Sequence, residues 1–159
     1  MTKEQINTYT MRISQANASG LAVIIYDMIL DYIDEGMQNY ENGDQEKFEA
    51  SMQKAQAALQ QLMSMSKMDS QVGLDVMALY LFVDKQILMS MVKREPVQLE
   101  ECRKCLEKLR ASFLEISKKD NDPPLMEHVQ QVYAGLTYGK GQLNESYDPL
   151  DDINRGFQA

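Results

Sequence analysis

Apolar residues fill nearly every position of the segment 21–33, whose only charges are Asp27 and Asp31. These two acids recur at helical spacing with Asp34 and Gln38 and form one narrow polar stripe along a predicted helix. A helix at the surface of a small bundle needs an apolar face over only about a third of its circumference. We therefore expect one side of this helix to face the core. A second side should be covered by the chain's own N-terminal arm or by another protein.

Three further segments continue the helical pattern, at residues 44–67, at residues 71–93 and from Pro96 onward. Their apolar residues recur at steps of three and four, which is the spacing of a seam between packed helices. Each of the four helices would have about 20 residues and a length of ~30 Å, and the links between them are short. Short links make consecutive helices antiparallel. The sequence therefore predicts an all-α fold, an antiparallel four-helix bundle.

Residues with strong preferences for helix ends mark the predicted boundaries. Ser19 is a candidate N-cap of the first helix, which would end near Tyr40 before an Asn-Gly turn. Asp44 is expected to cap the second helix. Pro96 suits the first turn of the fourth helix, because a proline at that position loses no hydrogen bond.

The two ends of the chain differ in pattern from the middle. The N-terminal arm is polar, but its apolar residues Ile6, Tyr9 and Ile13 fall on one helical face. Near the other end, two prolines precede a shorter apolar pattern that predicts a fifth helix. We divide the chain into an N-terminal arm (1–18), a four-helix bundle (19–117), a linker with a short fifth helix (118–137) and a polar C-terminal tail that we expect to be mobile (138–159).

The balance of charge restricts the class of partner. A formal net charge of −8 argues against nucleic acid or an anionic membrane as the main partner. No apolar run reaches the length of a transmembrane helix, and no signal peptide of the secretory type opens the sequence. The two cysteines are too few to staple a small secreted domain. We expect a cytoplasmic protein that does not insert into a membrane.

The chain offers little for catalysis or for a cofactor. It has one histidine, His128, which excludes the paired-histidine sets of di-iron, haem and zinc sites. No glycine-rich phosphate loop and no nucleophile motif is present. We therefore predict no enzyme, no cofactor and no metal. Two alternatives to a binding function stay open: a histidine phosphotransfer bundle acting through His128, and a purely structural homo-oligomeric bundle.

The wide apolar surface of the first helix favours a groove for a partner. Twelve methionines add flexible side chains that adapt to different surfaces. A groove of this kind holds an amphipathic helix, and the arm is a candidate to cover it until a partner arrives. The pattern leaves open which side of each helix faces the core. The residues predicted to line the groove are Leu21, Ile24, Ile25 and Met28 on the first helix and Leu81 and Leu88 on the third, with Ile6, Tyr9 and Ile13 of the arm as the plug.

The order of these features resembles the bacterial flagellar secretion chaperones of the FliS family. The resemblance covers about residues 6–116. It rests on the arm with Ile6 and Tyr9, the segment Ile25-Tyr26-Asp27, an Asn-Gly-Asp turn, the segment Lys54-Ala55-Gln56, the pair Leu79-Tyr80, and Leu109-Arg110 followed by an aromatic residue. Tyr26, Asp27, Leu79 and Tyr80 are the positions that match family motifs. Two departures are Gly20, where members often have proline, and Phe113, where many have tryptophan.

The resemblance implies a bacterial cytoplasmic chaperone of flagellum assembly. Such a protein binds the disordered C-terminal region of flagellin, prevents its premature polymerisation and delivers it to the flagellar type III export apparatus. An export-gate protein is then a second partner, and a monomer or a weak homodimer is the expected state. The family's arm plugs the apolar site of the free chaperone, and Ile6 and Tyr9 are the matching positions. The segment after Lys118 has no counterpart in this resemblance.

Overall fold

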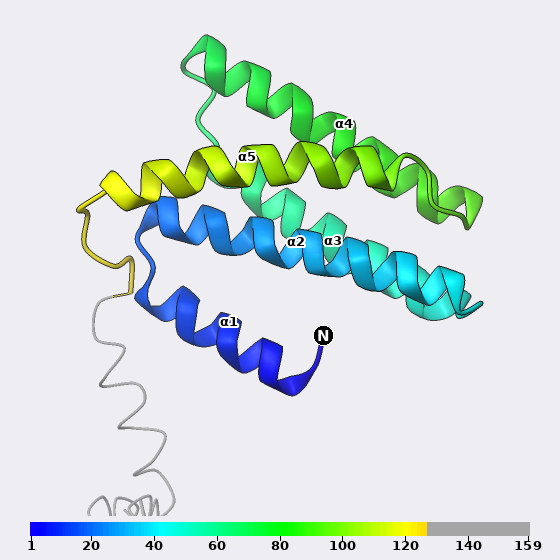
Figure 1. The fold of residues 1–159 in the computed structure, drawn as a ribbon. Helices are drawn as coiled ribbons and strands as arrows, with labels where there is room; N and C mark the ends of the chain where they lie inside the picture. Colours follow the sequence, from blue (N-terminus) through cyan, green and yellow to red (C-terminus); the bar gives the residue numbers. More distant parts are fainter. Residues whose placement is uncertain (127–159) are drawn as a thin grey trace, which may run out of the picture. The chain divides into compact units, whose positions relative to one another are not determined.

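The computed structural model describes residues 1–126, and this part of the chain contains five α-helices and no strand (Figure 1). They are α1 (Lys3–Gln15), α2 (Ala18–Glu41), α3 (Gln45–Met65), α4 (Gln71–Lys93) and α5 (Leu99–Lys119). α2 to α5 pack as a bundle, and α1 lies against α2. The predicted all-α bundle is confirmed. His128, most of the predicted fifth helix and the whole tail fall outside the described residues.

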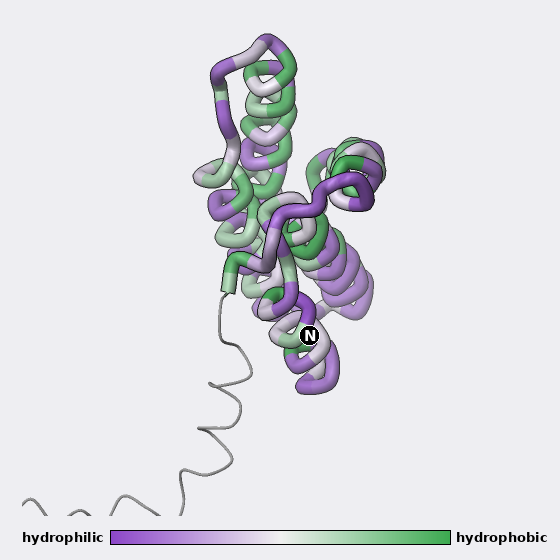
Figure 2. The backbone as a smooth tube through the Cα atoms, turned by 90° about the vertical axis from the view of Figure 1, so that its left-hand side faces the viewer, coloured by the Kyte–Doolittle hydropathy of each residue, from purple (hydrophilic) through white to green (hydrophobic). Residues whose placement is uncertain are grey.

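The core is built mainly around α2, which packs most extensively on α3 and α5. The side chains of α2 to α5 form one buried cluster. Its largest members, all fully buried, are Tyr26, Tyr80, Phe48, Ile29, Ile33, Met52, Leu59, Ile87, Leu99 and Leu106. Apolar residues also recur along the whole of α4, beyond those that reach this core (Figure 2). None of the helices within residues 1–126 has the length and apolar character needed to cross a membrane.

Side chains at the helix N-termini explain where the helices begin. Thr2 and Gln5 form a capping box on α1: the Gln5 amide donates to the Thr2 hydroxyl, and the Thr2 amide donates to the Gln5 side chain. Asp44 caps α3 through the Lys47 amide at 3.1 Å, as predicted. Ser70 caps α4, whose bounds agree with the predicted segment 71–93.

Two predicted helix ends were wrong. The N-cap of α2 is Asn17, whose side-chain oxygen accepts the Gly20 amide at 2.9 Å, so Ser19 lies inside the helix. Pro96 lies in the link before α5 and not in its first turn, because α5 begins at Leu99 after Gln98 in the left-handed region (φ 50°). Ser90 of α4 holds this link by accepting the Val97 amide at 2.9 Å.

Candidate partner-binding site

An apolar patch on α2 is covered by α1, which lies alongside it (Figure 1). Tyr9 and Ala16 are buried together with Ile24 of α2. Partly buried apolar side chains that pack against this small cluster are Met1, Ile13, Leu21 and Met28. The cluster is separate from the main core, so α1 acts as a cover on one side of α2 rather than as a member of the bundle.

Three polar contacts fasten α1 to successive turns of α2. Arg12 donates from Nη2 to Asp27 Oδ2 at 2.7 Å, and the Tyr9 hydroxyl donates to Asp31 Oδ2 at 2.7 Å. The ammonium group of Met1 contacts Glu35 Oε1 at 2.8 Å. The three acids are spaced by four residues and so lie on one face of α2. Two acids of the predicted stripe, Asp27 and Asp31, thus hold α1 together with Glu35, which the prediction did not include.

Asp27 is largely enclosed and joins three helices. One carboxylate oxygen accepts from Arg12 of α1, and the other accepts from Nε of Arg110 of α5. The Asp27 side chain is 15% exposed. Charged hydrogen bonds to both oxygens offset the cost of removing this carboxylate from water. Two turns further along α2, Asp34 pairs with Arg103 of α5 at 2.9 Å.

Burial keeps the Tyr9 hydroxyl neutral. The pKa of Tyr9 is raised well above its ordinary value of 10, first by burial and then by the hydrogen bond to Asp31 and by the negative charges of Asp31 and Asp27. The hydroxyl therefore remains a hydrogen-bond donor to Asp31 throughout the physiological pH range. The Arg12 guanidinium also lies 5.6 Å from the centre of the Tyr9 ring, which adds a cation–π contact within α1.

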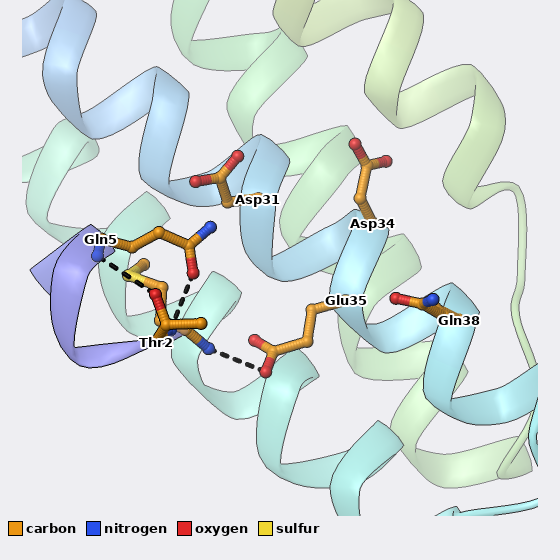
Figure 3. Close-up of a pocket in the computed structure, with 7 residues that line it drawn as sticks. Thr2, Gln5, Asp31, Asp34, Glu35 and Gln38 are labelled. Atoms are coloured by element: carbon orange, nitrogen blue, oxygen red, sulfur yellow. Dashed lines mark hydrogen bonds and ion pairs between the residues drawn. The ribbon is translucent and has the colours of Figure 1, made fainter.

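A polar pocket of about 460 Å³ opens where the start of α1 meets α2 (Figure 3). Thr2 and Gln5 line it from the arm. From α2 it is lined by the three carboxylates of Asp31, Asp34 and Glu35 and by Gln38. This lining suits water or a cationic group rather than an apolar side chain.

The predicted groove residues fall in three different places. Leu21, Ile24 and Met28 lie under α1. Ile25 belongs to the main core, and with Met28 it also lines a shallow groove of about 290 Å³ between α2 and α3. Leu81 and Leu88 lie on α4 and are 54% and 47% exposed. α4 lies on the far side of the bundle from α1 (Figure 1). The structure therefore does not bring the α2 and α4 residues together.

The three predicted plug residues also differ. Tyr9 is buried and Ile13 is partly buried against α2, whereas Ile6 is 52% exposed.

Of the family-motif positions, Asp27 belongs to the α1 site and Leu79 is exposed on α4. Tyr26 and Tyr80 are fully buried and share a hydrogen bond between their hydroxyls. Burial raises the pKa of both, so this pair holds the core together as neutral groups.

An exposed apolar stripe on α4 was only partly anticipated. The face of α4 opposite its core residues carries exposed Leu74, Leu81, Leu88 and Val92, and no other element among residues 1–126 covers these side chains. Steps of seven between Leu74, Leu81 and Leu88 place them on one line of the helix. This regular spacing is the signal from which the whole stripe could have been read.

The described residues hold no metal centre and no activated thiol. Among residues 1–126, no group of three or more histidine, cysteine, aspartate or glutamate side chains is placed to bind a metal. Cys102 and Cys105 are free. Burial raises the pKa of Cys102 to about 12 and also raises that of Cys105, so both remain protonated thiols near neutral pH.

The chain is similar to a known protein family. A family model described as flagellar protein FliS matches residues 1–120, which is most of the chain and contains all five helices. No curated protein matches the chain. The matched region includes α1 and the complete acidic stripe of α2.

Proposed function

Because the chain belongs to the flagellar protein FliS family, whose members are flagellar export chaperones, we propose that it binds the disordered C-terminal region of flagellin. In this proposal it prevents premature polymerisation of flagellin in the bacterial cytoplasm. It then delivers the subunit to the flagellar type III export apparatus, where an export-gate protein receives it. The family is one of chaperones rather than of enzymes.

The observation that carries the proposal is the way α1 occupies α2. An amphipathic helix of 13 residues lies there on the apolar cluster around Ile24 and is held by its own polar contacts. A surface that accepts one amphipathic helix has the width and the chemistry to accept another. A flagellin helix would displace α1 and use Leu21, Ile24 and Met28 as its apolar floor.

The exposed stripe of α4 supplies a second docking surface in this proposal. Leu81 and Leu88 lie far from the α1 site, so a cargo that contacts both surfaces must extend around the bundle. A disordered segment that folds on binding can cover separated surfaces of this kind. The ordering of the segment offsets part of its binding energy, which keeps the affinity moderate for a cargo that must be released.

Titration calorimetry of the chain against the C-terminal region of flagellin from the same bacterium tests the proposal. We expect one-to-one binding with a negative heat-capacity change and a gain of helix. Leu81→Ser combined with Leu88→Ser should weaken binding about tenfold or more. Ile116→Ser is the matched control, because Ile116 is equally exposed (55%) but lies on α5. Absence of binding by the unsubstituted chain at moderate salt would overturn the proposal.

A further inference from the structure

One carboxylate oxygen of Asp27 loses its hydrogen-bond donor whenever α1 leaves α2. The carboxylate is largely enclosed while α1 is docked, with one oxygen on Arg12 and the other on Arg110. Removal of α1 takes away Arg12 and leaves Arg110 of α5 in contact. A second helix that settles on the same apolar floor would enclose the freed oxygen again. A buried carboxylate oxygen without a donor is costly, so the incoming helix has to replace the lost cation.

Asp31 adds a second requirement at a fixed distance. Its carboxylate accepts from the Tyr9 hydroxyl, one turn before Arg12 along α1. α1 runs antiparallel to α2, because Tyr9 contacts Asp31 whereas Arg12 contacts Asp27. A replacement helix in the same direction would therefore need a polar donor three residues before its cation. Its apolar anchor, at the position of Ile13, would directly follow the cation.

We propose that Asp27 is a specificity-determining residue, selecting cargo helices that carry Arg or Lys where α1 carries Arg12. The inference rests on the proposed function and names the chemistry by which the α1 site distinguishes one helix from another. An amphipathic helix with an apolar or acidic residue at this position is rejected, because it leaves Asp27 enclosed with an unpaired oxygen. The apolar floor contributes affinity for any amphipathic helix, and the Asp27 carboxylate determines which of several equally hydrophobic helices binds.

Double-mutant cycles between chaperone and cargo test this inference. Each Lys and Arg of the flagellin C-terminal region is replaced in turn by Gln, and each variant is titrated against the unsubstituted chaperone and against Asp27→Asn. We expect one cargo position at which the replacement weakens binding about tenfold to the unsubstituted chaperone and less than about twofold to Asp27→Asn. Asp27→Asn also loosens α1, but this affects every cargo variant equally and cancels in the ratio.

Two further chaperone variants make the result specific. Asp34→Asn is the matched control, because Asp34 lies on the same helix but pairs with Arg103 of α5 and not with α1. It should leave the tenfold effect in place. Asp27→Glu keeps the negative charge, so the cargo replacement should still weaken binding to this variant nearly tenfold. If changes at position 27 acted only by unfolding the chaperone, Asp27→Glu would lose this difference as Asp27→Asn does. The inference is overturned if every cargo replacement weakens binding equally to the unsubstituted chaperone and to Asp27→Asn.

A separate probe distinguishes failure of this inference from failure of the proposed function. If flagellin does not bind at all, the proposed function fails, and a synthetic peptide of residues 1–15 then tests Asp27 directly. The acceptor is the full chain with Tyr9→Ala and Arg12→Glu, in which the resident α1 is unfastened. Fluorescence anisotropy should show the peptide binding about fivefold or more tightly than the same peptide with Arg12→Gln. Equal binding of the two peptides would remove Asp27 as a selector.

Discussion

α2 and α4 are both apolar around most of their circumference, yet among residues 1–126 only α2 has its outer surface covered. The outer side of α2 carries a row of acids that fastens α1 over its apolar residues. The outer side of α4 carries Leu74, Leu81 and Leu88 without such a row, and no other element among residues 1–126 lies over them. Within residues 1–126, the apolar face that has a cover is thus the one whose acids make polar contacts with that cover.

The two surfaces also differ in how a partner would reach them. No element among residues 1–126 has to leave before a partner reaches the α4 stripe, whereas the α2 patch opens only after α1 has been released. A cargo could therefore bind the α4 stripe first, without displacing any helix of residues 1–126, and displace α1 from α2 in a second step. The proposed Asp27 selection acts at the second step, where apolar contact alone gives little discrimination between helices.

The largest expected difference is in the free energy of unfolding, between substitutions on the buried face and on the exposed face of α4. Ile87 is fully buried, and its neighbour Leu88 is half-exposed. Ile87→Ala should lower the free energy of unfolding by about 2–5 kcal/mol, because it leaves a cavity in the core. Leu88→Ala should lower it by less than about 0.5 kcal/mol. Urea unfolding of both variants checks this, and similar losses would mean that the stripe is packed rather than free.

Unfastening α1 should have the next largest effect. Tyr9→Ala removes a buried ring and the hydrogen bond to Asp31, at a cost of about 1–3 kcal/mol to the docking of α1. Hydrogen exchange should accelerate in the amides of α1 and remain slow in those of α3. Under the proposed function, flagellin should also bind more tightly, since the competing helix is weakened. Unchanged exchange in α1 would show that Tyr9 does not hold it.

The hydroxyl of Tyr9 should make the α1 contact sensitive to high pH. In the unfolded chain this group ionises near pH 10, whereas in the folded chain its pKa is raised by burial and by Asp31. A raised pKa gives a stabilisation that is complete below pH 10 and is lost as the pH rises toward the folded value. The advantage of the unsubstituted chain over Tyr9→Phe, about 1 kcal/mol near neutral pH, should therefore shrink above pH 10.

Urea unfolding of both chains between pH 8 and pH 11.5 measures this difference. Other buried groups with raised pKa values, such as Tyr26 and Cys102, titrate in both chains and cancel in the comparison. An advantage that stays constant over the whole range would contradict the account of Tyr9 as a neutral donor to Asp31.

Periodicity predicted the helices and the existence of a second apolar face, but not what each face meets. The step pattern placed α4 at its observed bounds, because local spacing and the cap at Ser70 carry that information. The same pattern grouped Leu81 and Leu88 with Leu21 in one groove, whereas they lie on different sides of the bundle. Period alone gives the angle of a residue around its own helix and not the identity of the neighbouring helix.

Long-range polar partners were equally invisible in the sequence. The acids of α2 were recognised as a stripe, but Arg110, which holds Asp27 from α5, lies 83 positions further along the chain. Local ambiguity explains the missed cap, since Asn17 and Ser19 are both common N-cap residues and stand two positions apart. The structure gives the cap to Asn17 and leaves the Ser19 hydroxyl to contact Asp120, beyond the end of α5.

The smallest expected effect on the docking of α1 concerns the contact between Ser19 and Asp120. It lies near the link between α1 and α2 (residues 16–17), which we call the elbow. Asn17 donates to the carbonyl oxygen of Asp122, and the Leu125 amide donates to the carbonyl oxygen of Ala16 at 2.9 Å, so residues 120–125 lie across the elbow. The hydroxyl of Ser19 and the Asp122 amide lower the pKa of Asp120, and the support they give is present above about pH 4 and lost as the pH falls below it.

Ser19→Ala should therefore accelerate hydrogen exchange in the last turn of α1 by a small factor, about two- to fivefold, and much less than Tyr9→Ala does. Ser112→Ala on α5 is the control, because its hydroxyl bonds only within its own helix. An acceleration as large as that of Tyr9→Ala would place the main fastening of α1 at the elbow instead of on the acidic stripe. The contrast between α2 and α4 would then rest on where the chain after α5 passes, and not on the acids of α2.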